Sequence, residues 1–293
     1  MTPHLCTSVT ELRTICDTAR AGGSVAFVPT MGALHAGHAS LIREAKQHGS
    51  VVVVSIFVNP TQFGPSEDLQ RYPRDLEGDF QHCRALGVDV VFAPSVEELY
   101  AGGDRTRVRV TELGEFLCGA SRPGHFEGVA TVVTKLFAAV GSCTAVFGRK
   151  DYQQLAIVRQ LVGDLLLPVR IVDCATVREH DGLALSSRNR ALSEVERRNA
   201  RAIPRALSTA IRHYDAGERS VTHLRGLVER ELLASNLKLD YVALADPERL
   251  FLLEDEHLAQ GQVLLAVAVH CGSTRLIDNV VLGVDSPPYE GQS

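Results

Sequence analysis

The stretch "SVAFVPTMGALHAGHASLIREAKQHGSVVVVSIFV", residues 24–58, predicts a strand, a helix and a second strand in that order. Residues 24–28 form a short apolar run, residues 38–49 place their apolar side chains on one helical face, and Gly49 is a candidate helix C-cap. Residues 51–58 are apolar on both faces, as in a parallel strand that helices cover on both sides. The stretch therefore predicts a β-α-β unit.

The same alternation continues to about residue 175. Further strands are predicted at 88–94, 143–148 and 169–174, and further helices at 75–87, 129–141 and 151–165. Repeated β-α-β units with short connections predict an α/β fold, a Rossmann-like doubly wound parallel sheet with helices on both faces.

The pattern changes from about residue 183. It predicts helices at 193–217, kinked at Pro204, and at 220–235, followed by strands at 239–246, 262–270 and 274–283. With 293 residues, the chain is longer than one core usually fills. We therefore expect two domains, residues 1–178 and a smaller α+β C-terminal domain of residues 183–293.

Composition excludes several classes of protein. The formal net charge is −5 and no long basic tract occurs, so non-specific nucleic-acid binding lacks its electrostatic basis. No apolar run approaches the roughly 20 residues of a membrane span. The seven cysteines are scattered and form no C-x-x-C pair, which argues against a disulfide framework and favours a cytoplasmic protein.

Candidate functional residues lie in the loops that follow the predicted strands, where ligands bind in doubly wound sheets. In the loop of residues 29–38, Gly32 allows backbone to approach a ligand, and His35 and His38 are three residues apart at a helix start. Two imidazoles beside a helix N-terminus suit phosphoryl oxygens. A zinc pair and a buried core histidine are the alternatives for these rings.

Two other loops contain suitable polar groups. Asn59 and Gln62 are neutral donors and acceptors that suit a small substrate with hydroxyl and carboxylate groups, although a polar turn is the favoured interpretation of these two residues taken alone. Residues 186–188, Ser-Ser-Arg, suit triphosphate oxygens, and the alternative is a linker with an N-cap serine. Arg122 taken alone is a surface charge.

Five ordered blocks between residues 24 and 193 resemble one family. P-T-M-G-A-L-H-x-G-H, F-V-N-P-x-Q-F, R-P-x-H-F-x-G, F-G-x-K-D-Y-Q-Q and V-R-E-x-D-G-L-A-x-S-S-R-N are similar to motifs of the pantothenate synthetase family, within the HxGH nucleotidylyltransferase superfamily. The chain departs from the family pattern at Arg149, where the family has glutamate, and at Leu185, where it has methionine.

The resemblance implies ATP-dependent condensation of pantoate with β-alanine to pantothenate. The implied route passes through pantoyl adenylate and releases pyrophosphate and AMP, with Mg²⁺ as a cofactor. The small C-terminal domain is expected to cover the active site, and the resemblance implies a homodimer. The expected partners are therefore small molecules, with neither nucleic acid nor membrane among them.

The resemblance also assigns residues to roles. Catalysis is expected of His38, His35, Lys150 and Arg188. ATP contacts are expected of Met31, Gly32, His35, His38, Gly148, Lys150, Asp151, Val177, Leu185, Ser186, Ser187 and Arg188. Substrate contacts are expected of Pro29, Thr30, Asn59, Gln62, Arg122, His125 and Gln154, and Asp79 matches a position associated with magnesium.

Two other functions remain as alternatives. The first is a nucleotidylyltransferase of the same superfamily, which Gln62 and Gln154 disfavour because they are not base-reading groups. The second is a non-catalytic nucleotide-binding regulator, which the intact His38, Lys150 and Ser-Ser-Arg residues disfavour.

Overall fold

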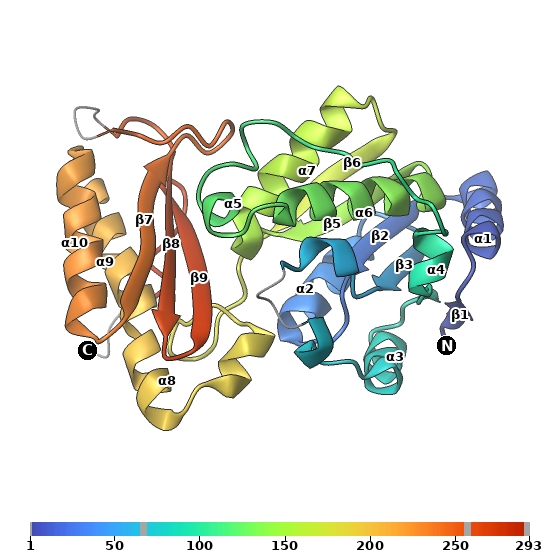
Figure 1. Cartoon of the computed structure of the whole chain (residues 1–293), viewed down its shortest axis with the longest axis horizontal. Helices are drawn as coiled ribbons and strands as arrows, with labels where there is room; N and C mark the ends of the chain where they lie inside the picture. Colours follow the sequence, from blue (N-terminus) through green and yellow to red (C-terminus); the bar gives the residue numbers. More distant parts are fainter. Residues whose placement is uncertain (1, 65–68, 255–258, 290–293) are drawn as a thin grey trace. The chain divides into compact units, whose positions relative to one another are not determined.

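The computed structural model describes residues 2–64, 69–254 and 259–289 (Figure 1). The chain forms two compact units. Unit 1 comprises Met1–Glu115, Arg122–Arg149 and Ile157–Ala175. Unit 2 comprises Thr176–Ser293 together with two short segments, Phe116–Ser121 and Lys150–Ala156.

Unit 1 is built on a six-stranded sheet. Its strands are β1 (His4–Cys6), β2 (Val25–Thr30), β3 (Val51–Ile56), β4 (Val90–Phe92), β5 (Cys143–Gly148) and β6 (Val169–Cys174). They lie in the order β1-β4-β3-β2-β5-β6, and every neighbouring pair is parallel. The predicted parallel sheet is confirmed, and β2 is its switch point because β3 and β5 flank it on opposite sides.

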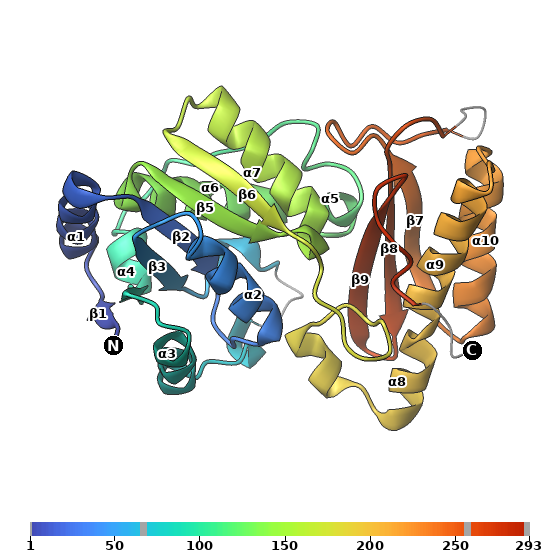
Figure 2. The same cartoon turned by 180° about the vertical axis from the view of Figure 1, so that it is seen from behind.

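Helices cover both faces of this sheet. α1 (Val9–Gly22) and α6 (His125–Val140) pack together on one face, and α2 (Ala36–Ala45) contacts β2, β3, β5 and β6 on the other. Figure 1 shows α6 in front of the strands, and Figure 2, seen from behind, shows α2 in front. The remaining helices of this region are α3 (Leu76–Ala85), α4 (Val96–Leu99) and α7 (Tyr152–Asp164).

Side chains of β2 alternate between two apolar layers. Val28 belongs to the cluster that includes Ile42 of α2 and Cys83 of α3. Phe27 points to the other layer, where its ring meets that of Phe137 on α6 edge to face at 6.3 Å. Burial on both faces is why these strands are apolar throughout rather than alternating.

Unit 2 contains a three-stranded antiparallel sheet. Its strands are β7 (Lys238–Ala245), β8 (Val263–Cys271) and β9 (Thr274–Leu282), in the order β7-β8-β9. α9 (Ala202–Asp215) packs on β9 and α10 (Val221–Ala234) packs on β7, and together they cover one face of the sheet (Figure 1). The short helices of this unit are α5 (Cys118–Ser121) and α8 (Glu194–Ala200). The predicted α+β character is confirmed.

Two predicted helices differ from the structure. Residues 193–217 form two helices that separate at Arg201, and Pro204 lies in the first turn of α9. The predicted single helix is therefore wrong, and the interruption expected at Pro204 occurs three residues earlier, because proline disfavours a continuous helix through the turn that precedes it. α6 begins at His125, before the expected residue 129, because Gly124 adopts φ 81° at its N-cap.

The N-terminal β1 and α1 were not predicted. α1 buries Leu12 and Cys16 completely, although most of its other residues are polar or small. Across the described residues, no helix combines the length and the apolar composition needed to cross a bilayer.

Candidate functional site

The two histidines form the N-terminal cap of α2. His35 is the N-cap residue, with extended backbone, and its Nδ1 accepts a hydrogen bond from the backbone N–H of Gly37 at 3.1 Å. Nδ1 of His38 accepts from the backbone N–H of His35 at 3.3 Å. A capping box usually uses serine or threonine with glutamate, whereas here two imidazoles satisfy the helix's unpaired donors. The ring centroids of the two histidines lie 4.1 Å apart.

This cap determines the tautomer of both rings. A backbone N–H only donates, so Nδ1 of His35 and Nδ1 of His38 both act as acceptors. A neutral imidazole whose Nδ1 accepts carries its proton on Nε2. Both Nε2–H groups are therefore donors beside a helix N-terminus, where the backbone adds partial positive charge. The arrangement suits developing negative charge on a phosphoryl group.

The end of β2 is fixed to its neighbour β3. Pro29 pairs with Ser55 in the sheet register, and the hydroxyl of Thr30 donates to the carbonyl of Ser55 at 2.7 Å. The same hydroxyl accepts from the backbone N–H of Gly32 at 3.1 Å. Thr30 is buried, so its hydroxyl supports the loop from inside.

Asp79 of α3 supports the middle of the same loop. Its Oδ2 accepts from the backbone N–H of Ala33 at 2.8 Å, and its Oδ1 accepts from that of Leu34 at 2.7 Å. The residue is only 4% exposed. No group of three His, Cys, Asp or Glu residues in the described part of the chain is arranged to hold a metal ion. Both carboxylate oxygens of Asp79 thus accept from backbone amides of the loop.

Asn59 organises the short helix η1 (Pro60–Gln62). Its Nδ2 donates to Oε1 of Gln62 at 3.0 Å and to the carbonyl of Gly128 at 3.1 Å. Its Oδ1 accepts from the hydroxyls of Thr61 at 2.9 Å and Tyr100 at 2.8 Å. Both amide hydrogens of Asn59 are thus used within the protein, and the residue is 1% exposed. Its geometry is that of a support for Gln62.

Gln62 connects three other predicted site residues. Its Nε2 donates to the sulfur of Met31 at 3.1 Å, and its backbone carbonyl lies 2.8 Å from Nδ1 of His125. Nη1 of Arg122 lies 3.1 Å from Nε2 of His125. A guanidinium only donates, so Nε2 of His125 accepts and its Nδ1–H donates to Gln62. The structure brings these four residues together.

β5 ends beside β2 at the switch point of the sheet. Phe27 of β2 pairs with Ala145 of β5, and β5 continues to Gly148. The next residue, Arg149, places its Nε 3.6 Å from Oδ2 of Asp173 on β6. The charge that replaces the family's glutamate is therefore directed toward a carboxylate of the neighbouring strand.

Unit 2 contains a small pocket that Lys150, Ser186 and Arg188 share. Its volume is about 10 Å³, which is room for about one water molecule. Arg275 of β9 also lines the pocket, and its Nε and Nη2 donate to Oδ2 of Asp240 at 2.9 and 2.7 Å. Arg275 was not predictable as a pocket residue, because a single arginine in a predicted strand cannot be distinguished from an ordinary surface charge.

Ion pairs hold the segment that carries the two serines. Arg197 of α8 donates from Nη2 to both oxygens of Asp181 at 2.7 Å, and from Nη1 to Glu179 at 3.0 Å. Asn189 also donates to Glu179, at 2.6 Å. Burial raises the pKa of Asp181, but the bonds from Arg197 and from the N–H of Leu183 outweigh it and leave the pKa below its ordinary value. The same balance lowers the pKa of Glu179.

The remaining predicted site residues occupy the same stretches of chain. Asp151 is exposed at the end of η3 (Arg149–Asp151), and Gln154 lies in the first turn of α7. The carbonyl of Val177 accepts from the N–H of Leu185 at 2.9 Å. Ser187 begins η4 (Ser187–Ala191), which Ser186 caps by accepting from the N–H of Arg188 at 3.3 Å. The N-cap interpretation of Ser186 is therefore correct, whatever else this hydroxyl contacts.

Comparison with known proteins identifies the family. The model of the family described as pantoate-beta-alanine ligase matches residues 4–281. The chain belongs to the pantoate-β-alanine ligase family. It is 52% identical over 284 residues to the pantothenate synthetase of Moorella thermoacetica, covering 96% of this chain and 99% of that protein.

Solved structures of this ligase family show the same fold. The pantothenate synthetase of Thermus thermophilus matches with a TM-score of 0.88 and 46% identity, covering 98% of this chain and 99% of that chain. The pantoate-β-alanine ligase of Francisella tularensis, complexed with beta-gamma ATP and β-alanine, matches with a TM-score of 0.76 and 34% identity, covering 97% of this chain and 99% of that one.

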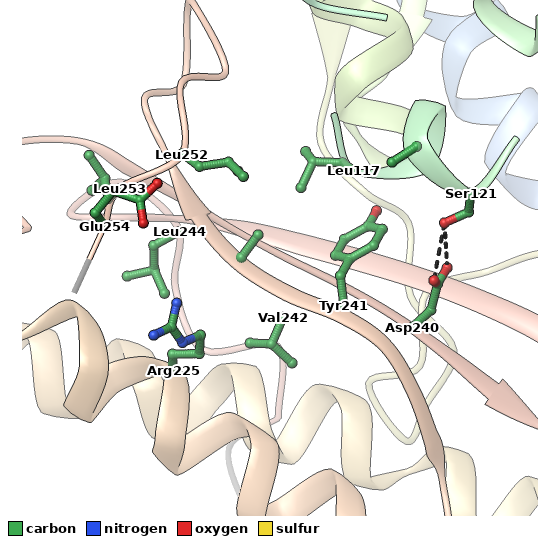
Figure 3. Close-up of a pocket in the computed structure, with 12 residues that line it drawn as sticks. Leu117, Ser121, Arg225, Asp240, Tyr241, Val242, Leu244, Leu252, Leu253 and Glu254 are labelled. Atoms are coloured by element: carbon green, nitrogen blue, oxygen red, sulfur yellow. Dashed lines mark hydrogen bonds between the residues drawn. The ribbon is translucent and has the colours of Figure 1, made fainter. Parts of the chain in front are cut away.

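A separate cavity in unit 2 of this ligase contains none of the predicted site residues. It encloses about 530 Å³ and is lined by β7, by Leu252–Glu254 and by residues of the 117–121 segment (Figure 3). Figure 3 shows Ser121 directed at Asp240, to which its hydroxyl donates at 3.1 Å. Burial and the neighbouring Cys118 raise the pKa of Tyr241, which also lines the cavity.

Proposed function

We propose that the chain joins pantoate to β-alanine at the expense of ATP, with pantoyl adenylate as the intermediate. The observation that supports this most directly is the histidine cap, which presents two Nε2–H donors at the switch point of the sheet. The identity of the substrates is supported by the match of residues 4–281 to the pantoate-β-alanine ligase family.

In the first step, a carboxylate oxygen of pantoate attacks the α-phosphorus of ATP. The bond from that phosphorus to the bridging oxygen of the β-phosphate breaks, and pyrophosphate leaves. Negative charge grows on the phosphoryl oxygens, and fixed donors stabilise it without having to reorganise. We assign this role to His38 and His35, with Lys150 and Arg188 adding positive charge and Ser186 and Ser187 adding hydroxyl donors.

In the second step, the amine of β-alanine attacks the activated carbonyl carbon. The nitrogen loses a proton, the carbon–oxygen bond to the phosphate breaks, and AMP leaves with pantothenate as the product. No side-chain nucleophile is required, so the protein contributes mainly orientation and charge stabilisation.

We assign substrate binding to the cluster around Gln62. Its side chain lies against Met31, and His125 and Arg122 extend the hydrogen-bonded chain from its carbonyl. Gln154 is proposed as a second amide for pantoate, and Pro29 and Thr30 as the floor of the site. The Francisella tularensis relative was complexed with β-alanine and beta-gamma ATP, which fits these assignments.

For the nucleotide, we propose contacts from Met31 and Gly32 and from the loop that follows β5. These contacts come from Gly148, Lys150 and Asp151, while Val177 and Leu185 would supply backbone to the adenine. Magnesium is a proposed co-reactant of ATP, and both oxygens of Asp79 are engaged by backbone amides of the loop.

One assay tests the proposal against its alternatives. The protein is incubated with ATP, Mg²⁺, pantoate and β-alanine, and AMP and pantothenate are measured. The proposal requires both products in equal amounts and no AMP release without pantoate. Pyrophosphate release with a nucleotide-like product would identify a nucleotidylyltransferase instead. Tight ATP binding without turnover would identify a regulator.

We also propose a homodimer in the cytoplasm. All seven cysteines are free thiols, and six of them are buried. Sedimentation equilibrium would measure the mass of the assembly, and a monomeric mass at micromolar protein would reject the dimer.

A further inference from the structure

Asp79 of α3 holds the turn that leads into the two histidines. Its two carboxylate oxygens accept from successive backbone amides, those of Ala33 at 2.8 Å and Leu34 at 2.7 Å. The residue is 4% exposed, and it lies 45 residues along the chain from Leu34. A charged acceptor that is buried and fully directed at one loop is a strong and specific constraint.

The turn itself has an uncommon backbone. Gly32 has φ 83° and Ala33 has φ 53°, so two successive residues are left-handed, a conformation that disfavours alanine. Successive amides in such turns point toward a common centre and create a concave anion site. Asp79 fills that centre. A Cβ on Gly32 would lie 2.7 Å from Oδ2 of Asp79, so the carboxylate also requires glycine at this position.

The constraint continues directly to the histidines. Leu34 is followed by His35, whose backbone N–H donates to Nδ1 of His38. A shift of Leu34 therefore moves the N-cap residue and loosens the bond that fixes the second ring. Positioning errors near 1 Å in a catalytic group cost about 100-fold in rate.

We propose that Asp79 is a positioning residue that sets the geometry of His35 and His38, and that it does not ligate magnesium. The inference rests on the proposed function for its kinetic part only. Magnesium is usually held by one or two carboxylates, by waters and by the nucleotide's phosphates. Here both Asp79 oxygens already accept amide protons from the loop, and the carboxylate is only 4% exposed. The magnesium ion therefore arrives with ATP.

Asp79→Asn tests the two roles against each other. The amide can accept from one backbone N–H but presents its own donors to the other, so the turn must shift. We expect kcat to fall at least about 10-fold while KM for β-alanine changes less than about 3-fold, as misplacement of a catalytic group predicts. The magnesium concentration for half-maximal rate should stay unchanged. A magnesium requirement that rises in step with the loss of rate would overturn the proposal.

A double-mutant cycle with His38→Ala shows whether Asp79 acts through the histidines. In the His38→Ala background, Asp79→Asn should cost less than about 2-fold, because coupled residues are not additive. Full additivity of the two losses would contradict the proposal. Asp89→Asn is the matched control, since Oδ2 of Asp89 accepts from the backbone N–H of Val52 at 2.8 Å at the start of β3. It should lower stability and leave kcat unchanged.

Two readouts do not require turnover. Imidazole nitrogen NMR should show Nε2–H tautomers for His35 and His38, altered by Asp79→Asn and unaltered by Asp89→Asn. Mn²⁺ binding to the ATP complex, followed by electron paramagnetic resonance, should be equal in wild type and Asp79→Asn. Weaker Mn²⁺ binding in the variant, or unchanged imidazole signals, would refute the positioning role.

The design separates the two proposals. If the wild type makes no pantothenate, the proposed function fails, while the imidazole signals still test Asp79. If Asp79→Asn does not fold, Asp79→Glu replaces it, because it keeps the charge but displaces the carboxylate by one methylene. That variant should lower kcat with normal Mn²⁺ binding, and a normal kcat would reject the proposal.

Discussion

Nδ1 of His38 accepts a hydrogen bond from the backbone N–H of His35 at 3.3 Å, so the second histidine of the loop pairs with the N-cap residue of α2. Each ring therefore has two functions on opposite nitrogens. Nδ1 stabilises the start of α2, and Nε2 carries the proton of the ring. A substitution that replaces Nδ1 but not Nε2 can separate the capping of α2 from the proposed catalytic role.

His38→Ala should lower turnover by at least about 100-fold through loss of a charge-stabilising donor. His38→Asn should be equally slow but more stable than His38→Ala, because the asparagine oxygen can accept from His35 in place of Nδ1. Steady-state kinetics and thermal unfolding of the pair measure the two effects. Near-normal turnover in His38→Asn would show that Nε2 takes no part in the reaction.

Lys150→Ala should also lower kcat by at least about 100-fold, since it removes a positive charge from the pocket shared with Ser186 and Arg188. Lys238, at the exposed start of β7, provides the control substitution to alanine. Both variants should keep the wild-type circular dichroism spectrum. Equal kcat values for Lys150→Ala and Lys238→Ala would show that Lys150 takes no part in catalysis.

Gly128→Ala should disrupt the substrate cluster. A Cβ at this position of α6 would lie 2.4 Å from the carbonyl oxygen of Thr61 and 2.7 Å from Cα of Gln62. Overpacking of this kind costs about 1–3 kcal/mol of stability. KM for β-alanine should rise with it, because η1 and the side chain of Gln62 must move. If Gly128→Ala lowers the melting temperature but leaves KM for β-alanine unchanged, Gln62 does not bind the substrate.

Gly163→Ala is the matched control in α7. Nothing lies within 4 Å of a Cβ built at Gly163, so the added methyl group meets no neighbour. Alanine in place of a helical glycine gains about 0.5–1 kcal/mol. Gly163→Ala should therefore be more stable than wild type and equally active. If Gly163→Ala is destabilised instead, steric overlap does not explain the effect of Gly128→Ala.

Stability should fall in acid through the pairs of Arg197 with Asp181 and Glu179. Both carboxyl groups have folded-state pKa values below their ordinary 3.8 and 4.5. Their contribution is therefore complete above about pH 5 and disappears as the pH falls through the lowered folded values. Urea unfolding at pH 7 and pH 3 should show a smaller pH effect in Arg197→Met than in wild type. The exposed neighbour Arg198 supplies the control, and Arg198→Met should retain the wild-type pH effect.

Strands β2 to β6 and the longer helices between them were predictable, because burial on both faces makes the strands apolar throughout. Residues 51–58 had to be a covered parallel strand, and β3 is one. α1 was not predicted from the sequence, because its only buried residues are Leu12 and Cys16 and they make too weak an apolar pattern. Only Pro204 indicated the division at Arg201, because the periodicity of the apolar residues continues across it.

The position of the two histidines, in a loop that follows a strand at the switch point of the sheet, was predictable from the sequence. The sequence could not show that the rings cap their own helix, because the cap depends on distances between nitrogens. It also could not show that Asn59 supports Gln62, or that Asp79 lies against Leu34. Each of these contacts depends on the direction in which a side chain points.

The contact between Arg149 and Asp173 links the residue choices at two neighbouring strand ends. A glutamate at position 149 would bring a second carboxylate close to that of Asp173, where like charges repel. Relatives that keep glutamate at 149 should therefore lack an acidic residue at 173, and relatives with arginine at 149 should retain one. The replacement of glutamate by Arg149 is then matched by the acidic residue Asp173, and positions 149 and 173 should vary together across the family.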